Sequence, residues 1–174
     1  MYWCDVAVAM VLFYIKKSMD ISKFKNKDRN KRYEKYISSK KYDTTHIEET
    51  VNTAFNHIQS GEKSFVIYGQ PQSGKTDMMI GLCSKLFDEG TEIIIVLVQS
   101  ITLLENQNRT RFAESGINPG PKWFAEIMEP DYKFEGRKHL LFCTKETRHL
   151  RNLIAYLKTD SAMTSSQLLQ IICT

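Results

Sequence analysis

The stretch SFVIYGQPQSGKT, residues 64–76, decides the fold predicted for this chain. Its first part, Phe65-Val66-Ile67-Tyr68, is a short apolar run rich in β-forming residues, which is typical of a buried strand. After Gly74, apolar residues recur at the spacing of one helical face, namely at Met79, Leu82, Cys83, Leu86 and Phe87. Gly90 follows as a helix stop. The sequence therefore predicts a strand, a glycine-containing loop and an amphipathic helix in succession.

Residues Gly69 to Thr76 fit the pattern G-x-x-x-x-G-K-[ST] of the phosphate-binding P-loop, or Walker A motif. Backbone N–H groups of such a loop, together with the helix N-terminus behind it, bind phosphate oxygens. Gly69 allows a sharp turn, and Gly74 allows close approach of the backbone to the phosphates. Lys75 is expected to reach the β and γ phosphates, and the Thr76 hydroxyl is expected to ligate Mg²⁺.

The predicted site residues follow from this motif. We predict that Lys75 and Thr76 act in catalysis and that Thr76 holds the metal ion. The predicted nucleotide-binding residues are Gly69, Gln70, Gln72, Ser73, Gly74, Lys75 and Thr76.

The composition is that of one globular domain, with 174 residues, 42% hydrophobic and 25% charged. The formal net charge of +4 is unevenly distributed, because residues 16–41 carry eleven Lys or Arg and three Asp or Glu. The four cysteines lie far apart and form no C-x-x-C pair, so neither a zinc site nor a disulfide framework is indicated. Reduced thiols in the cytoplasm are the simpler interpretation.

The N-terminal region differs from the rest of the chain. Residues 6–15 are apolar and predict a buried or interfacial helix, too short for the ~20 residues of a membrane span and without the features of a signal peptide. The basic, tyrosine-containing segment that follows fits either a nucleic-acid-binding arm or a solvated linker. We expect a helical and basic extension over residues 1–43 and a P-loop domain over residues 44–174.

The remaining segments alternate between strand and helix patterns. A capping box at Thr45-x-x-Glu48 starts a helix that ends at Gly61. Apolar strands are predicted at 92–98 and 139–143, with a further apolar run at 168–172. Helices are predicted from Ser100 to about Gly116 and over residues 150–157. The pattern of residues 122–136 mixes features and predicts neither a helix nor a strand. This order predicts an incomplete α/β fold with a parallel sheet flanked by helices.

ATP hydrolysis by a P-loop protein needs an Asp or Glu at the end of an apolar strand. The strand at 92–98 ends in Gln99-Ser100, the strand at 139–143 ends in Thr144-Lys145, and Glu146 falls within the next helix. We therefore expect the acid to lie after Thr174 or to be absent. We also expect the chain to be a truncated part of a larger ATPase and to hydrolyse ATP poorly by itself. The sequence contains neither the N-K-x-D motif of GTPases nor the L-S-G-G-Q signature of transporter ATPases.

Beyond the P-loop, several short motifs resemble one ATPase superfamily. They are Gln72 to Thr76 with Met79 and Leu82, Asp88-Glu89-Gly90, the strand Ile94 to Leu97, Leu104-x-x-Gln107-x-x-x-Arg111, and Leu141-Phe142 with Lys145, Leu150, Leu153 and Leu157. Over residues 62–158 the chain resembles the N-terminal RecA-like lobe of superfamily 2 helicase-like ATPases. More narrowly, it is similar to the Z1-domain family of endonuclease-associated ATPases in bacterial and phage defence systems.

The resemblance implies ATP and Mg²⁺ as cofactors, and DNA or RNA as a partner. It places a single-strand contact at Ser100, Gln107 and Arg111, and it implies a second lobe or a partner chain. A Gln that reads adenine upstream of the P-loop is also implied, but none stands at a suitable spacing. No membrane partner is expected.

Two other functions stay open on sequence grounds. A small phosphotransferase would need an arginine-rich lid, for which Arg148 and Arg151 are candidates, although both also fit the solvent face of a helix. A nucleotide-binding interaction module without catalysis would need only the loop.

Overall fold

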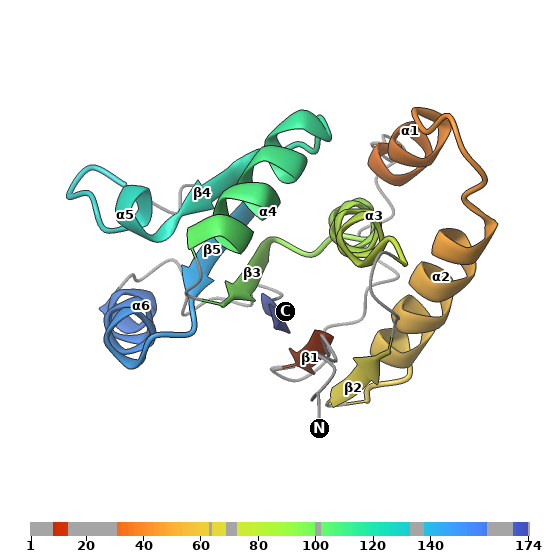
Figure 1. Cartoon of the computed structure of the whole chain (residues 1–174). Helices are drawn as coiled ribbons and strands as arrows, with labels where there is room; N and C mark the ends of the chain where they lie inside the picture. Colours follow the sequence, from red (N-terminus) through yellow and green to blue (C-terminus); the bar gives the residue numbers. More distant parts are fainter. Residues whose placement is uncertain are drawn as a thin grey trace, which may run out of the picture.

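The computed structural model describes residues 9–13, 31–62, 64–68, 73–99, 102–132, 138–159 and 169–173. These residues form a six-stranded sheet in the order β2-β1-β6-β3-β5-β4, with helices on both sides (Figure 1). The strands are β1 Ala9–Phe13, β2 Ser64–Ile67, β3 Ile93–Val98, β4 Pro121–Trp123, β5 His139–Thr144 and β6 Leu169–Cys173. The helices are α1 Arg32–Ser38, α2 Thr45–Gln59, α3 Lys75–Asp88, α4 Thr102–Glu114, α5 Phe124–Ile127 and α6 Thr147–Thr159.

The sheet is parallel on one side and mixed on the other. Strand β3 pairs in parallel with both β5 and β6, aligning Ile95 with Leu141 and with Ile171. Strand β1 lies antiparallel between β2 and β6, aligning Val11 with Phe65 and with Ile172. Strand β2 therefore runs in the same direction as β3, so that the carboxyl ends of both strands lie at the same edge of the sheet.

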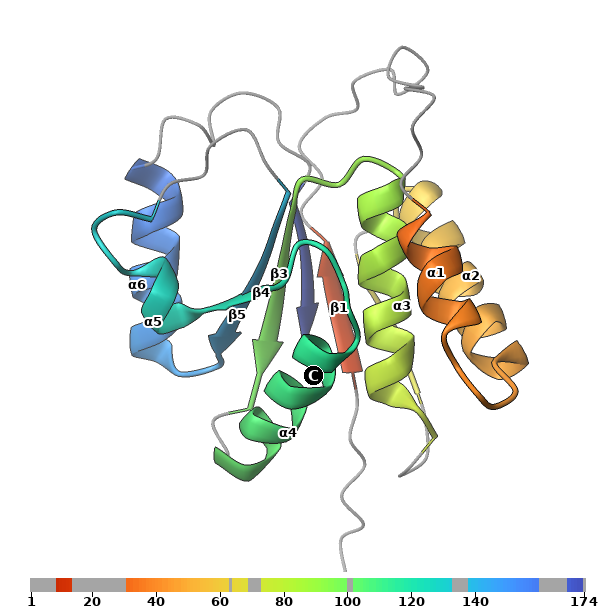
Figure 2. The ribbon, with the colours of Figure 1, turned by 90° about the horizontal axis from the view of Figure 1, so that it is seen from above.

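Apolar side chains of β3 and β5 enter two separate cores. Ile94, Val96 and Val98 pack on the face covered by α1, α2, α3 and α4, whereas Ile93 and Ile95 pack on the face covered by α5 and α6. Figure 2 shows these two helical layers on opposite sides of the strands. Because both faces are covered, both strands are apolar without alternation, as expected for buried parallel strands.

Helix α3 packs closely against α1 and α2. A Cβ atom at Gly81, in the middle of α3, would lie 3.2 Å from Val51 Cγ2 and 3.5 Å from Tyr33 Cε2. The absence of a side chain at Gly81 thus allows α1 and α2 to approach the helix that begins at the P-loop. This packing holds the N-terminus of α3 in a fixed position relative to α1.

The helix predicted for residues 6–15 is wrong for the part that the structure describes, because Ala9–Phe13 form strand β1. A short apolar run does not distinguish a buried strand from a buried helix by its periodicity. The run becomes a strand here because β2 and β6 both offer backbone partners, and burial in a sheet requires each backbone polar group to be paired.

The other predicted strands and helices are present, but the strand before the P-loop is not buried as predicted, because β2 lies at the edge of the sheet and Val66 is 55% exposed. Further differences are local. The cap of α2 lies one residue earlier than predicted: Thr44 is the N-cap, and its hydroxyl donates to Glu48 Oε1 at 2.7 Å. The segment with mixed signals contains β4 and the short helix α5, which begins where Trp123 N–H donates to Glu126 Oε2 at 2.8 Å. The observed α/β fold, with its parallel strands flanked by helices, agrees with the prediction.

Candidate nucleotide-binding site

The site predicted from the P-loop lies at the N-terminus of α3, beside the carboxyl end of β2. Gly74 is the N-cap residue and adopts a left-handed conformation, with φ of 77° and ψ of 21°. This conformation favours glycine over any residue with a Cβ atom. The helix continues with a bond from Met78 N–H to Gly74 O at 2.9 Å. The first N–H groups of a helix have no acceptor within it, so this end attracts anions.

The Ser73 side chain provides a test of whether phosphate fits this loop. Its hydroxyl oxygen is buried and has no hydrogen-bond partner among the residues that the structure describes. A buried hydroxyl without a partner is unfavourable and is usually satisfied by water or by a ligand. Its position directly before Gly74 fits a phosphate oxygen as the partner.

Thr76, in the first turn of α3, is the residue through which this site would hold a metal ion. Among the described residues there is no cluster of three or more His, Cys, Asp or Glu side chains that could bind a metal. Mg²⁺ in nucleotide sites commonly uses one or two protein ligands, with phosphate oxygens and water supplying the others. A single hydroxyl at Thr76 fits this kind of site.

Asp77 follows Thr76 and accepts three hydrogen bonds from the segment that precedes α2. The donors are Tyr36 OH at 2.6 Å, Tyr42 OH at 2.7 Å and Lys40 Nζ at 2.8 Å. Burial alone would raise the pKa of the Asp77 carboxyl, but the bonds from Lys40, Tyr36 and Tyr42 outweigh burial and lower it. Burial and the bond to Asp77 raise the pKa of Tyr42 to about 12. The four side chains therefore form a charged, hydrogen-bonded cluster that fixes the first turn of α3.

We expect this cluster to make stability depend on pH in the acid range. Because the pKa of Asp77 is lowered in the folded state, its contribution to the free energy of unfolding is complete above about pH 4. This contribution is lost as the pH falls through the lowered pKa. Asp77→Asn should reduce the free energy of unfolding by about 1–3 kcal/mol at pH 7, because the bonds to the charged carboxylate are lost. Urea unfolding of both proteins from pH 7 down to pH 2.5 would measure the difference.

The difference between wild type and Asp77→Asn should shrink toward the acid end of this series. Asp131→Asn, at an exposed carboxyl, is the matched control and should change little at any pH. A difference between wild type and Asp77→Asn that is equal at every pH would contradict the role assigned to the charge.

Arg111 reaches the same helix end from α4. Its guanidinium donates to Thr76 Oγ1 at 3.3 Å. Gln107, one turn earlier on α4, is exposed to solvent, as is Arg111. The structure thus brings Arg111 to the P-loop helix, whereas Gln107 forms no hydrogen bond with the part of that helix that the structure describes. Ser100, Gly69, Gln70 and Gln72 lie outside the described residues.

Sequence reasoning missed the cluster around Asp77. It treated the basic segment as an arm or a linker, yet Tyr36 in this segment is buried in the core against α3, and Lys40 and Tyr42 bind the same carboxylate. Tyr36 lies on α1, whereas Lys40 and Tyr42 follow the end of that helix. The acid directly after the P-loop was the available signal.

The carboxylate needed for hydrolysis does not appear at the described carboxyl ends of β3 and β5. These ends carry Gln99 and Thr144, and the Thr144 hydroxyl lies 2.5 Å from His149 Nδ1. Glu146 lies next to the same histidine, with its Oε2 atom 3.7 Å from His149 Nε2. Of the predicted P-loop, the structure therefore describes Ser73 to Thr76, and no carboxylate stands at the described carboxyl ends of β3 and β5.

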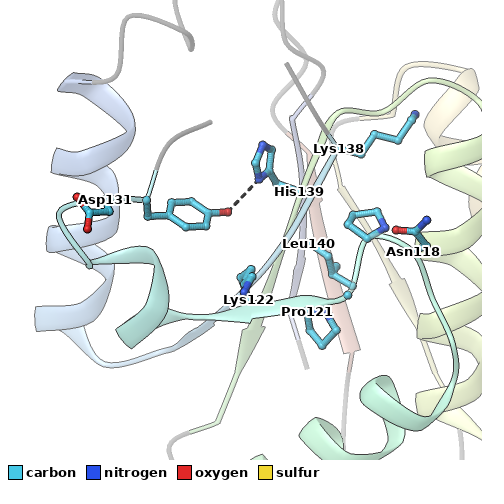
Figure 3. A pocket seen from close by; sticks show the side chains of 10 residues that line it. Asn118, Pro121, Lys122, Asp131, Lys138, His139 and Leu140 are labelled. Carbon is cyan, nitrogen blue, oxygen red and sulfur yellow. Dashed lines mark hydrogen bonds between the residues drawn. The ribbon is translucent and has the colours of Figure 1, made fainter. Parts of the chain in front are cut away.

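A cavity of about 790 Å³ lies at the opposite edge of the sheet, at the amino ends of β4 and β5 (Figure 3). The Tyr132 hydroxyl and His139 Nδ1 are 2.9 Å apart in its wall. Lys138 points toward α3, where its ammonium group donates to the backbone oxygens of Phe87 and Thr91. Lys138 therefore caps the C-terminus of α3, and the cavity is remote from the P-loop.

The fold and the loop define an α/β domain that binds phosphate at the N-terminus of the helix after β2. Residues 36–172 match the family model described as "Type III restriction enzyme, res subunit". The chain belongs to this family, and it is accordingly a helicase-like ATPase lobe of restriction type. No curated protein and no solved structure matches the chain significantly.

Within the described residues, no helix has the length and apolar character needed to cross a membrane.

Proposed function

We propose that this chain binds ATP with Mg²⁺ at residues 69–76 and couples its nucleotide state to single-stranded nucleic acid. The observation that carries the proposal is the N-terminus of α3, where left-handed Gly74 and the buried Ser73 hydroxyl form part of a phosphate cradle. The family match over residues 36–172 supports the assignment to a helicase-like ATPase.

Each residue of the loop has a defined task in this proposal. Ser73 and the first N–H groups of α3 donate hydrogen bonds to phosphate oxygens, and Lys75 neutralises charge on the β and γ phosphates. The Thr76 hydroxyl holds Mg²⁺, which when bound stabilises negative charge on the phosphates. The Asp77 cluster keeps the helix end in place, because its donors come from α1 and the segment after it.

Helix α4 is the proposed contact with nucleic acid. Gln107 and Arg111 are exposed on α4, and Ser100 precedes the helix. Exposed amide and guanidinium groups are suited to hydrogen bonds with phosphates and bases. Because Arg111 of the same helix contacts Thr76, a strand bound to α4 would influence the nucleotide site directly.

Titration with a fluorescent, non-hydrolysable ATP analogue tests the proposal. We expect saturable binding that strengthens when Mg²⁺ is added and strengthens again with a single-stranded oligonucleotide. Binding of nucleotide without any effect of the oligonucleotide would favour a phosphotransferase or a non-catalytic module. An absence of nucleotide binding would contradict the proposal as a whole.

The narrower parts of the proposal concern biological context. We place the chain in a restriction or defence system, next to a second lobe or a partner chain, and the resemblance to the Z1-domain family stays a prediction. The buried thiols of Cys83 and Cys143, which form no disulfide, support a cytoplasmic location.

A further inference from the structure

Arg111 is a cation in the candidate site that no motif assigns to the nucleotide. Its guanidinium donates to Thr76 Oγ1 at 3.3 Å, in the first turn of α3. Among the residues that the structure describes, no carboxylate forms an ion pair with Arg111. The nearby carboxylate of Asp77 pairs instead with Lys40 at 2.8 Å.

This arrangement is unusual for an arginine in a purely structural role. A guanidinium group carries five donors in a planar fork that matches carboxylate or phosphate oxygens. Here it donates to one hydroxyl group, and that hydroxyl belongs to the residue expected to hold Mg²⁺ between the β and γ phosphates. A triphosphate held at this helix end would place its terminal phosphate near Thr76, where the remaining donors are available to it.

We propose that Arg111 is a positioning residue that binds the γ-phosphate, so that the site distinguishes a nucleoside triphosphate from a diphosphate. The proposal rests on the proposed function of the P-loop. On binding of the triphosphate, the guanidinium turns from Thr76 Oγ1 to the γ-phosphate oxygens, leaving the hydroxyl to the metal ion. Release of the γ-phosphate returns Arg111 to Thr76.

Electrostatics favours this assignment over a contact with the diphosphate portion alone. In a P-loop the loop N–H groups surround the inner phosphates and the lysine reaches the β and γ phosphates, while the γ-phosphate is the most exposed and most highly charged group. Arg111 approaches from α4, on the side of α3 where Thr76 lies, and not from the segment after α1, which supplies Lys40 to Asp77.

The test compares a triphosphate analogue with ADP, both titrated against the whole chain with Mg²⁺ present. Arg111→Ala should weaken binding of the triphosphate analogue by about tenfold or more, the value of one charge-assisted hydrogen bond. Binding of ADP should change by less than about threefold, because no γ-phosphate contact is lost. Arg111→Lys should restore part of the triphosphate affinity, since it keeps the charge and loses the fork.

Arg109→Ala is the matched control, because Arg109 lies two residues away on α4, with its guanidinium 5.4 Å from the centre of the Trp123 ring. It removes the same charge and should leave both affinities unchanged. Thermal unfolding of each variant establishes that the fold is retained.

Three results would overturn the proposal. Equal loss of ADP and triphosphate affinity in Arg111→Ala would show a general electrostatic or structural effect, and no loss would show that Arg111 does not bind phosphate. If wild type binds the triphosphate analogue more tightly at low Mg²⁺ than at high Mg²⁺, Arg111 competes with the metal for Thr76. If wild type binds neither nucleotide, the proposed function fails first, and this inference fails with it.

Discussion

Lys75→Ala is expected to lower the affinity for an ATP analogue by about 10- to 100-fold. The reason is local: Lys75 is the first residue of α3, directly after the left-handed Gly74, and a lysine at this position of a P-loop is expected to reach the phosphates. A hydrogen bond between two charged groups contributes about twice as much as a neutral one. Loss of the ammonium group leaves phosphate charge in the cradle without its main side-chain partner.

The measurement is the same titration with a fluorescent analogue, together with a thermal unfolding curve for each protein. Lys35→Ala is the control, because Lys35 is an exposed lysine on α1, away from the first turn of α3. It removes the same charge and should leave the dissociation constant within about twofold of wild type. Nucleotide binding by Lys75→Ala at wild-type affinity would show that the bound molecule sits elsewhere.

Phe142→Ala should have the largest effect on stability, lowering the free energy of unfolding by about 3–5 kcal/mol. Phe142 lies on β5, is fully buried, and its ring is 4.8 Å from Phe112 and 4.7 Å from Trp123, measured between ring centres. These rings come from α4 and β4, so one substitution removes contacts that join three elements. The cavity left behind adds to the cost, because the surrounding strands cannot fully close it.

Unfolding in urea, followed by circular dichroism, measures this change. Ile154→Ala is the control, because Ile154 is a large apolar residue that is 51% exposed on α6. Its replacement should change the free energy of unfolding by less than about 1 kcal/mol. Equal effects of the two substitutions would mean that Phe142 is not in a packed core in solution.

The pattern of apolar residues was sufficient to predict those strands and helices that are specified by adjacent residues. The run at 92–98 and the run at 139–143 are apolar without alternation, and both became parallel strands covered on two faces. The helix after Gly74 was equally clear, because its apolar positions repeat at helical spacing. Residues 9–13 were predicted incorrectly, since a short apolar run takes the form that its neighbours offer, and here they offer two strands.

The sequence by itself determined the strand and the helix on either side of the P-loop and predicted the kind of ligand that this loop suits, because the motif depends on adjacent residues. Only the tertiary structure decided which other side chains meet there. Tyr36, Lys40 and Tyr42 bind Asp77, and Arg111 binds Thr76, across separations of 35 to 41 residues. Such contacts arise from the packing of α1 and α4 against α3, and packing is fixed by the whole core, not by any single stretch of the chain.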